Sequence, residues 1–547
     1  MQITANLVNI SARTTQVATV TFAQQKIKDI QLLQPHEDTT LPYLIPGFVD
    51  AHIHIESSML TPSQFARMAV VHGTVATVSD PHEIANVCGM AGVEYMVADG
   101  NTVPFKFYFG APSCVPATTY ETAGAAITVA DIDTLLQQPH IHYLAEMMNY
   151  PGVLYNDADV LAKIALAKKY NKPVDGHGPA LTGENAIKYI NAGITTDHEC
   201  TTYAEALHKL QHGMKILIRE GSAAKNFDAL IPLLSKYTNQ IMFCSDDKHP
   251  DALELGHINQ LCQRAVVAGY NVYDVLQAAC CNPVQHYNLA VGQLLVGDPA
   301  DCVLVDNLTN FNVLQTYINS QLVASNGSTN IVAKQAGIIN NFNCEPTTAA
   351  QFEILTTYYQ GVTVPVIIAN NEQLITGHTH LPKTQLLQHN ALVSNPNIDV
   401  LKLVVINRYK PAPIAIAFIQ NFGIKKGAIA STVAHDSHNI IAVGVCDNSI
   451  SAAVNLVIAN QGGLSYAMPN GANSVLPLPI AGLMTNACGY EVSRLYTQLD
   501  TFVKQQMGST LTAPYMTLSF MALLVIPHLK LSDKGLFDGS TFQFYKQ

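Results

Sequence analysis

The sequence predicts an α/β protein centred on a TIM-like (β/α)8 barrel, with a small β-sandwich built from both flanks of the barrel and a C-terminal α+β domain. Between residues 46 and 290, short apolar runs alternate with helix-length amphipathic segments, which is typical of βα units and a parallel sheet. Eight such runs fall within about 245 residues, the usual count and size for this barrel. Reactive side chains also stand at the carboxyl ends of most of these runs.

The composition predicts a large, deeply buried protein. The chain has 547 residues, of which 48% are hydrophobic and 13% charged, and its net charge is -11. This length favours two or three domains. The negative charge, without a run of Lys or Arg, argues against a nucleic-acid partner. We find neither a leader pattern at Met1 nor an apolar run of roughly 18 residues, so we expect a cytoplasmic protein without a membrane partner. The eleven cysteines form no Cys-x-x-Cys pair, so no disulfide framework is predicted.

The segments that flank the barrel carry β patterns. Residues 3–10, 15–22 and 27–33 are rich in β-branched residues and alternate in polarity. After the barrel, residues 291–306 resemble a hairpin around a Gly-Asp-Pro turn, and residues 321–324 a further strand. We therefore predict that residues 1–45 and 291–340 form one composite β-sandwich domain.

The barrel is predicted to occupy residues 46–290. Its eight strands are expected at residues 47–54, 74–80, 105–110, 142–148, 173–177, 193–198, 214–219 and 240–246. A doubly wound open sheet is the competing fold, but it usually has fewer strands and a glycine-rich first turn, which this chain lacks.

The third region, residues 345–547, is predicted to be a separate α+β domain. Strand candidates lie at residues 362–369, 400–407, 414–419, 440–446 and 518–526, and a helix is expected at residues 450–459.

The first barrel strand carries a His-x-His pair. Ile53 separates His52 from His54, so both imidazoles point to the same side of a strand and are able to bind one metal ion. The alternative is that the two histidines only share a solvated face. The run before them is apolar without alternation, as in a strand buried on both faces, and such a strand has no solvated face.

Further reactive residues follow the later barrel strands. In chain order they are Asp80 with His82 and Glu83, then Glu146, His177, His198, Arg219 and Asp246. Any one of them alone has a structural explanation, as a surface acid, a loop residue or a helix cap. Together they are expected to meet at the mouth of the barrel, where the carboxyl ends of all eight strands converge.

The donor types at these strand ends favour metal-dependent hydrolysis. Four imidazoles and the carboxylates of Glu146 and Asp246, without thiolate, suit two borderline metals: Fe(II), Mn(II) or Zn(II). Two metals that share a water lower its pKa and supply a nucleophile near neutral pH. Glu146 is placed to bridge them, and Asp246 to take a proton from the nucleophile and pass it to the leaving group.

Several motifs resemble the amidohydrolase superfamily and, within it, the adenine deaminase family. The resemblance covers nearly the whole chain. It rests on Pro46-Gly-Phe-Val-Asp-Ala-His-Ile-His54, Ser79-Asp-Pro-His-Glu83, Ala145-Glu-Met-Met-Asn149, Asp175-Gly-His-Gly-Pro179, Thr196-Asp-His-Glu199, Ser245-Asp-Asp-Lys248, Gly427-Ala-Ile-Ala-Ser-Thr-Val-Ala-His-Asp-Ser-His-Asn439 and Leu476-Pro-Leu-Pro-Ile-Ala-Gly-Leu-Met484.

This resemblance implies hydrolysis of adenine to hypoxanthine and ammonia, a reaction of purine salvage and adenine catabolism, at a binuclear manganese or iron site. It also implies a role for each site residue. The metal ligands are His52, His54 and Asp246 on one metal, Glu146 as the bridge, and His177 and His198 on the other. Asp246 and Glu83 are implied as catalytic residues, and Glu83 is expected to hydrogen-bond or protonate a purine ring nitrogen. Substrate binding is expected from Glu83, His82, Ser57, Asp247, His435 and His438. We further expect a homodimer.

Two other functions remain open from the residues. One is a related cyclic-amide hydrolase such as a dihydroorotase, although such enzymes commonly bridge their metals with a modified lysine where this chain has Glu146. The other is a catalytically inactive scaffold, which would have lost metal ligands that are all present here. The zinc nucleobase deaminase signature, with its Pro-Cys-x-x-Cys, is missing.

The segment 435–439 has two interpretations. It either forms a capping and turn network within the third domain or reaches the barrel mouth to cover the substrate or hold a further metal. The chain also has Asn407-Arg-Tyr409 where the family pattern leads us to expect an Arg-His pair.

Overall fold

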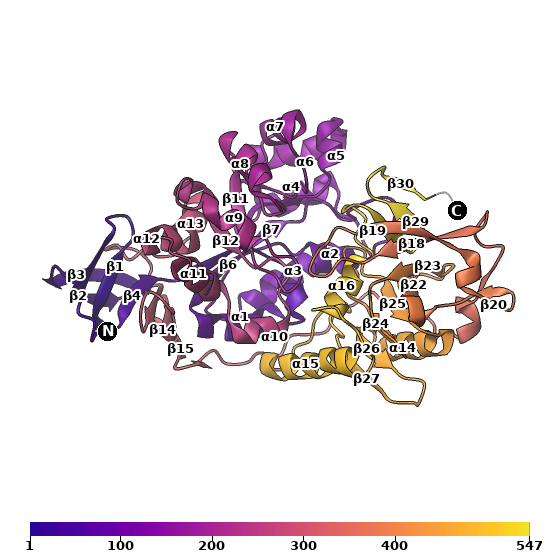
Figure 1. The fold of residues 1–547 in the computed structure, drawn as a ribbon. Coiled ribbons are helices and arrows are strands. Elements are labelled where there is room, and N and C mark those ends of the chain that lie inside the picture. Colours follow the sequence, from indigo (N-terminus) through magenta and orange to yellow (C-terminus); the bar gives the residue numbers. More distant parts are fainter. Residues whose placement is uncertain (546–547) are drawn as a thin grey trace.

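The computed structural model describes residues 1–545 and shows three parts in a row (Figure 1). A sheet that contains the N-terminus lies at one end, the barrel lies in the middle, and the C-terminal domain lies at the other end. The predicted fold class, a TIM-like barrel with additional β-rich domains, is confirmed. Within the described residues, no helix is both long enough and apolar enough to cross a membrane.

All eight predicted barrel strands are present, and neighbouring strands within each hydrogen-bonded group are parallel. Five form one group and three form a second. They are Phe48–Ile53 (β5), Thr74–Ser79 (β6), Lys106–Ala111 (β7), Ile141–Met147 (β8), Val174–Gly176 (β9), Thr196–Asp197 (β10), Lys215–Arg219 (β11) and Ile241–Cys244 (β12). Strands β5, β6 and β12 are buried throughout, as expected for strands of a parallel sheet that is covered on both faces.

The barrel closes between β12 and β5. The backbone N–H of Asp246 donates to the carbonyl of His52 at 2.9 Å, and that of His54 donates to the carbonyl of Asp246 at 3.2 Å. Below this junction the carboxylate of Asp50 accepts a hydrogen bond from the backbone N–H of Ser245 at 3.1 Å. The closure therefore holds Asp246 beside the His-x-His pair.

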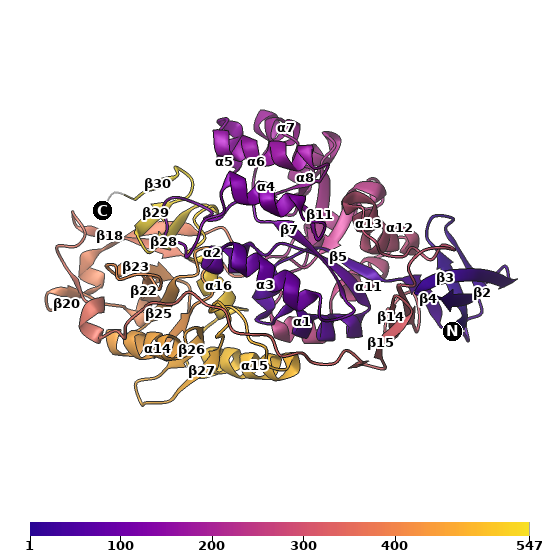
Figure 2. The same cartoon turned by 180° about the vertical axis from the view of Figure 1, so that it is seen from behind.

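Helices surround the barrel strands (Figure 2). They are Pro62–Ala69 (α1), His82–Cys88 (α2), Met90–Gly100 (α3), Val129–Gln137 (α4), Tyr150–Leu154 (α5), Ala158–Lys169 (α6), Gly183–Asn191 (α7), Tyr203–Gln211 (α8), Phe227–Leu230 (α9), Pro250–Leu255 (α10), Ile258–Val267 (α11), Val272–Leu276 (α12) and Asn282–Tyr287 (α13). Local sequence sets several of their starts. In α4, for example, Thr128 and Asp131 form a capping box in which each side chain accepts from the other's backbone N–H.

The two flanks of the barrel combine into one eight-stranded sheet, in the order β16-β15-β14-β13-β4-β1-β2-β3. The strands are Gln2–Asn9 (β1), Thr14–Ala23 (β2), Lys26–Gln34 (β3), Tyr43–Pro46 (β4), Cys302–Val305 (β13), Val313–Ile318 (β14), Gln321–Ser325 (β15) and Ser328–Thr329 (β16). The flanks join where β13 pairs with β4, with Val303 opposite Ile45. Phe22, Leu44 and Cys302 share a small core made from both flanks.

The predicted hairpin at residues 291–306 is wrong in its first arm. Only β13 is a strand, and the residues before it form a turn. The carboxylate of Asp298 accepts hydrogen bonds from the backbone N–H groups of Gln293 at 2.8 Å and Leu295 at 3.2 Å. Since this side chain satisfies the backbone donors locally, they do not join a ladder.

The chain then runs along the barrel to the C-terminal domain without regular structure, over residues 330–348 (Figure 2). Hydrogen bonds tie this segment to the surface it crosses. Tyr95 donates to the carbonyl of Gly337 at 2.9 Å, and Asn486 donates to that of Ala336 at 2.8 Å.

The C-terminal domain contains a second eight-stranded sheet, in the order β19-β18-β23-β22-β25-β24-β26-β27. Its strands are Thr363–Ile368 (β18), Gly377–Pro382 (β19), Val400–Ile406 (β22), Ala415–Gln420 (β23), Ala428–Ser431 (β24), Ile440–Gly444 (β25), Gly463–Ala467 (β26) and Asn473–Pro477 (β27). The predicted helix is confirmed as Asp447–Ala459 (α14), which packs on β24, β25 and β26. Smaller sheets are formed by Ile354–Leu355 (β17), Leu387–Gln388 (β20) and Ala391–Leu392 (β21), and by Leu529–Ser532 (β28), Gly535–Asp538 (β29) and Gln543–Phe544 (β30).

The strand predicted at residues 518–526 is wrong. This segment is instead the end of helix Pro514–Phe520 (α16) and a series of turns after it. The whole run is apolar and buried, so its periodicity carries no signal to separate a strand from a helix. Pro514 occupies the first helical turn, where proline favours a helix start. A longer helix, Gly489–Gln505 (α15), packs against α10 of the barrel.

Candidate metal centre

The predicted ligands meet at the carboxyl ends of the barrel strands, directly below the C-terminal domain. The first group comes from β5 and from the residue after β12. The Nε2 atoms of His52 and His54 lie 3.2 Å apart, and the Oδ1 atom of Asp246 lies 3.5 Å and 3.2 Å from them. All three side chains are buried. Three donor atoms of one strand junction therefore face a common point.

The second group is arranged around Glu146, near the end of β8. Its Oε2 atom lies 2.9 Å from Nδ1 of His177 and 3.1 Å from Nε2 of His198. Its Oε1 atom lies 3.3 Å from Nε2 of His54 in the first group. Glu146 therefore directs one oxygen to each group.

This arrangement fits two divalent metal ions. Ligand atoms about 2.1 Å from one ion, at angles between octahedral and tetrahedral, lie roughly 3.0–3.4 Å apart. The separations within both groups are close to that range. The donors are imidazole nitrogens and carboxylate oxygens, which suit borderline metals. Among the described residues, the buried Nε2 atom of His177 has no hydrogen-bond partner, and its Nδ1 atom is the one directed to Glu146.

Arg219, which was expected at the barrel mouth without an assigned role, supports Asp246, and Glu199, which was not predicted, contacts Arg219. The guanidinium of Arg219 donates to Oδ2 of Asp246 at 2.7 Å and also contacts Glu199. Glu199 in turn lies 3.5 Å from His198. Arg219 occupies the end of β11, so its position at a barrel strand end was the available signal, and Glu199 follows His198 directly. With Oδ2 held by Arg219, Asp246 presents Oδ1 to the histidines.

His82 lies between the cluster and the C-terminal domain. Its Nδ1 atom is 3.1 Å from Asp80 and 3.5 Å from Glu146, and its Nε2 atom is 3.5 Å from Glu83 and 3.6 Å from Asp436. Both ring nitrogens are buried, and neither forms a hydrogen bond with any residue that the structure describes. The ring therefore directs one nitrogen to the cluster and the other to Glu83 and to Asp436 of the C-terminal domain.

Glu83 is held by the C-terminal motif. His435 contacts one of its carboxylate oxygens and His438 contacts the other. Burial lowers the pKa of His435, but the charges of Glu83 and Asp247 outweigh this and raise that pKa to about 9. Burial would raise the pKa of Glu83, but the charges of His435, His438 and His82 together outweigh it and keep this pKa well below its usual range. Segment 435–439 therefore reaches the barrel mouth rather than forming only a local turn.

The remaining predicted substrate-binding residues differ in position. His435, His82 and Asp247 line the cavity above the cluster, whereas Ser57 and His438 lie outside its lining. Ser57 donates to Oδ1 of Asp247 at 2.5 Å. Burial and the neighbouring charge of Asp246 raise the pKa of Asp247.

The cavity above the cluster is small, about 20 Å³. Its floor consists of the cluster residues of the barrel, with Met148 at one side. The part that covers them, called the roof below, comes from the C-terminal domain. It consists of Leu374, His435, Asp436, Phe520 and Leu523. The site is therefore complete only when both domains are present.

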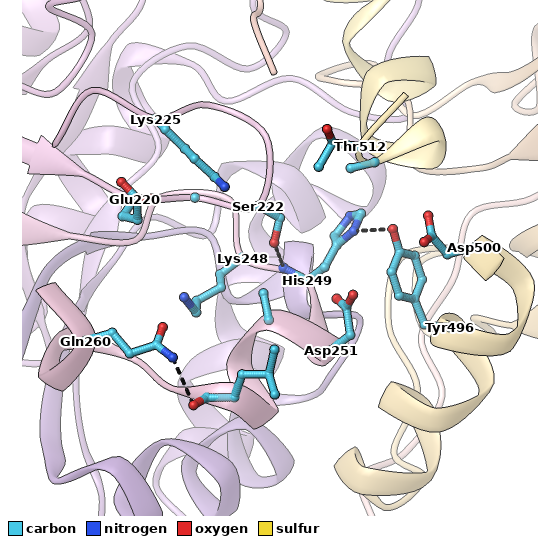
Figure 3. A pocket seen from close by; sticks show the side chains of 14 residues that line it. Glu220, Ser222, Lys225, Lys248, His249, Asp251, Gln260, Tyr496, Asp500 and Thr512 are labelled. Atoms are coloured by element: carbon cyan, nitrogen blue, oxygen red, sulfur yellow. Dashed lines mark hydrogen bonds between the residues drawn. The ribbon is translucent and has the colours of Figure 1, made fainter. Parts of the chain in front are cut away.

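A second cavity, of about 230 Å³, lies beside the site between the barrel and α15 (Figure 3). The loops after β11 and β12 form one wall, and Tyr496 and Asp500 of α15 form another. His249 and Tyr496 are joined across it by a 2.7 Å hydrogen bond between Nδ1 and the hydroxyl oxygen. None of its lining residues lines the cavity over the cluster. We interpret this contact as one tie that keeps the C-terminal domain over the barrel mouth.

Comparison with known proteins identifies the chain's relatives. Residues 43–329 match the amidohydrolase family, and residues 373–543 match the adenine deaminase C-terminal domain. The chain is 51% identical over 543 residues to a protein of Salinibacter ruber (strain DSM 13855 / M31) named adenine deaminase, an alignment that covers 99% of this chain and 98% of the relative. The chain belongs to the adenine deaminase family of amidohydrolases. A second relative of the same name, from Sulfurovum sp. (strain NBC37-1), is 52% identical over 544 residues and covers 100% of this chain and 99% of its own length.

Membership of the adenine deaminase family confirms the resemblance read from the motifs. It also makes a metal cofactor the expected partner of the cluster, since the amidohydrolase match covers the strands that carry all six ligand candidates. The C-terminal match covers the segments that roof the site.

Proposed function

We propose that the protein catalyses the hydrolytic deamination of adenine to hypoxanthine and ammonia. The observation that carries this is the similarity to adenine deaminases over the full length of the chain, which includes both the barrel floor and the C-terminal roof of the site. The buried cluster of nitrogen and oxygen donors at the barrel mouth supports the hydrolytic chemistry.

The metal site of this proposal is binuclear, with Mn(II) or Fe(II) as the expected ions and Zn(II) as the third option. His52, His54 and Asp246 would hold one ion, His177 and His198 the other, and Glu146 would bridge them. When bound, the two ions would lower the pKa of a water between them and so provide a nucleophile at neutral pH.

Proton transfer falls to two carboxylates. Asp246 presents Oδ1 toward the centre of the cluster because Arg219 holds Oδ2. It is therefore placed to take the proton released as water adds to C6 of adenine and to give it to the departing amino group, which leaves as ammonia. Glu83, held by His435 and His438, would share a proton with His435 and deliver it to the ring nitrogen next to C6. Protonation there makes C6 a better electrophile.

The remaining polar residues would orient the base. His82 and Asp247 line the cavity and are proposed to hydrogen-bond adenine directly. Ser57 is proposed to act through Asp247, and His438 through Glu83, because neither side chain lines the cavity.

The test is ammonia release from adenine by protein loaded with Mn(II), with a metal-free control. Adenosine is tested in the same assay, and ring opening of dihydroorotate is followed by its absorbance. Metal-dependent ammonia from adenine alone is the expected result. Ring opening of dihydroorotate instead, or equal ammonia release without metal, would overturn the proposal. A place in purine salvage or adenine catabolism, a cytoplasmic location and a homodimer are parts of the same proposal, and the dimer is tested by light scattering.

A further inference from the structure

The apolar part of the roof consists of side chains from two distant C-terminal segments. Leu374 comes from the loop between β18 and β19, and Phe520 and Leu523 come from the end of α16 and the turn after it. All three are almost fully buried. The cavity that they close has a volume near that of one water molecule. A substrate on the cluster therefore lies in direct contact with this roof.

One buried lysine fixes both roof segments. The Nζ atom of Lys530 donates to the carbonyl of Leu374 at 2.7 Å and to that of Phe520 at 2.9 Å. The backbone N–H of Leu531 donates to the carbonyl of Met521 at 3.0 Å. The Phe520 ring also stacks on His435, which itself contacts Glu83, with ring centroids 5.1 Å apart and an angle of 28°. The roof is thus a hydrogen-bonded structure and not a loose loop.

The chemistry at the floor determines which part of a purine meets the roof. In the proposed reaction C6 lies against the cluster, where Asp246 and Glu146 line the cavity. N9 lies on the far side of the fused rings from C6, so it points away from the floor. Adenine is larger than this cavity, so the roof must move outward to admit the base. A substituent on N9 requires a further displacement of Phe520 and Leu523, and close-packed side chains resist displacement.

We propose that Leu374, Phe520 and Leu523 are specificity-determining residues that restrict the enzyme to purine bases without a substituent on N9. The proposal rests on the proposed function, since it takes adenine as the substrate. It assigns the C-terminal domain a direct part in substrate choice, separate from its contact with Glu83.

The experiment compares kcat/KM for adenine, 9-methyladenine and adenosine in the Mn-loaded protein. In the wild type we expect adenine to be preferred over 9-methyladenine by about 10–200-fold, the range for one extra carbon in an apolar pocket. Phe520→Ala and Leu523→Ala should lower this preference about tenfold by raising kcat/KM for 9-methyladenine. Leu524→Ala is the matched control, because Leu524 is equally buried beside Leu523 but does not line the cavity.

Three results would overturn the proposal. The first is a wild type that uses 9-methyladenine as well as adenine. The second is an unchanged preference in folded, metal-loaded Phe520→Ala and Leu523→Ala, with Leu523→Val replacing the alanine variant if that variant does not fold. The third is a Leu524→Ala variant whose preference for adenine over 9-methyladenine falls as much as that of Phe520→Ala and Leu523→Ala.

A separate readout covers the case in which adenine is not the substrate. The rate at which dipicolinate removes Mn(II) from the holoenzyme depends on roof closure and not on catalysis. We expect Leu523→Ala to lose metal faster than both the wild type and Leu524→Ala. Equal rates in all three would refute a closing roof. If the protein does not deaminate adenine but Leu523→Ala still loses Mn(II) faster than the wild type and Leu524→Ala, only the proposed reaction is refuted.

Discussion

Replacement of Glu146 by glutamine tests the bridging role most directly. Glu146 directs Oε2 to His177 and His198 and Oε1 to His54. Glutamine keeps one oxygen acceptor but replaces the other with an amide donor. One of the two groups would then face N–H instead of a negatively charged oxygen. We expect metal content to fall below two ions per chain and kcat/KM to fall more than about 10⁴-fold, which is roughly 5.4 kcal/mol at 1.36 kcal/mol per tenfold.

Glu199→Gln is the matched control for this variant. Glu199 is as buried as Glu146 and also lies near His177 and His198, at 3.8 Å and 3.5 Å, but it is engaged by Arg219. Because Glu199 is expected only to support the ligands, Glu199→Gln should lower activity or metal affinity by only about 10–100-fold. Metal analysis by mass spectrometry and ammonia release measure both variants. Two metals per chain in Glu146→Gln, or equal metal loss in both variants, would refute a bridging Glu146.

Three further predictions concern other parts of the site. Arg219→Met removes the cation between the buried carboxylates of Asp246 and Glu199, so the metal-free protein should lose about 3–5 kcal/mol of unfolding free energy, measured by urea denaturation. Glu83→Gln should lower kcat for adenine about 10²–10⁴-fold with two metals still bound, because it removes the proposed proton-transfer group but no proposed ligand. For Lys530, burial lowers the pKa from 10.5 to about 7. The unfolded chain then binds more protons between these values, so stability rises with pH from about 7 to 10.5 and falls as pH decreases through that window. In Lys530→Met this part of the pH dependence should be lost, as followed by denaturation at several pH values.

Each of these predictions has a contradicting result. Unfolding free energy of metal-free Arg219→Met within about 0.5 kcal/mol of the wild type would mean that the carboxylates are satisfied elsewhere. A wild-type kcat in Glu83→Gln would show that Glu83 does not transfer the proton. Equal pH dependence in wild type and Lys530→Met would mean that Lys530 keeps its ordinary pKa.

The sequence predicted the floor of the site well because local rules apply there. A His-x-His pair on a strand points one way, and residues after parallel barrel strands converge at one mouth, so His52, His54 and Glu146 could be brought together without coordinates. Arg219 was expected at the mouth from its place at a strand end, but its contact with Asp246 was not. Glu199 was missed because a charged residue beside a ligand looks like any solvated charge until its burial is known.

The roof could not be predicted in the same way. The contact of Glu83 with His438 joins residues far apart in the chain, and neither residue carries a local signal for the other. The run at residues 518–526 is apolar on every side, so its packing within the domain decided between strand and helix. The turn at Asp298 likewise depends on one side chain that competes with ladder formation.

The composite sheet imposes an order on folding during synthesis. Strand β4 is made before the barrel, but its partner β13 is made only after the last barrel helix, with Val303 opposite Ile45. Until then one edge of β4 has no strand beside it, and exposed edges invite pairing with other chains. The N-terminal strands therefore become fully paired only after the whole barrel has left the ribosome. A nascent chain that pauses within the barrel is the species most exposed to aggregation.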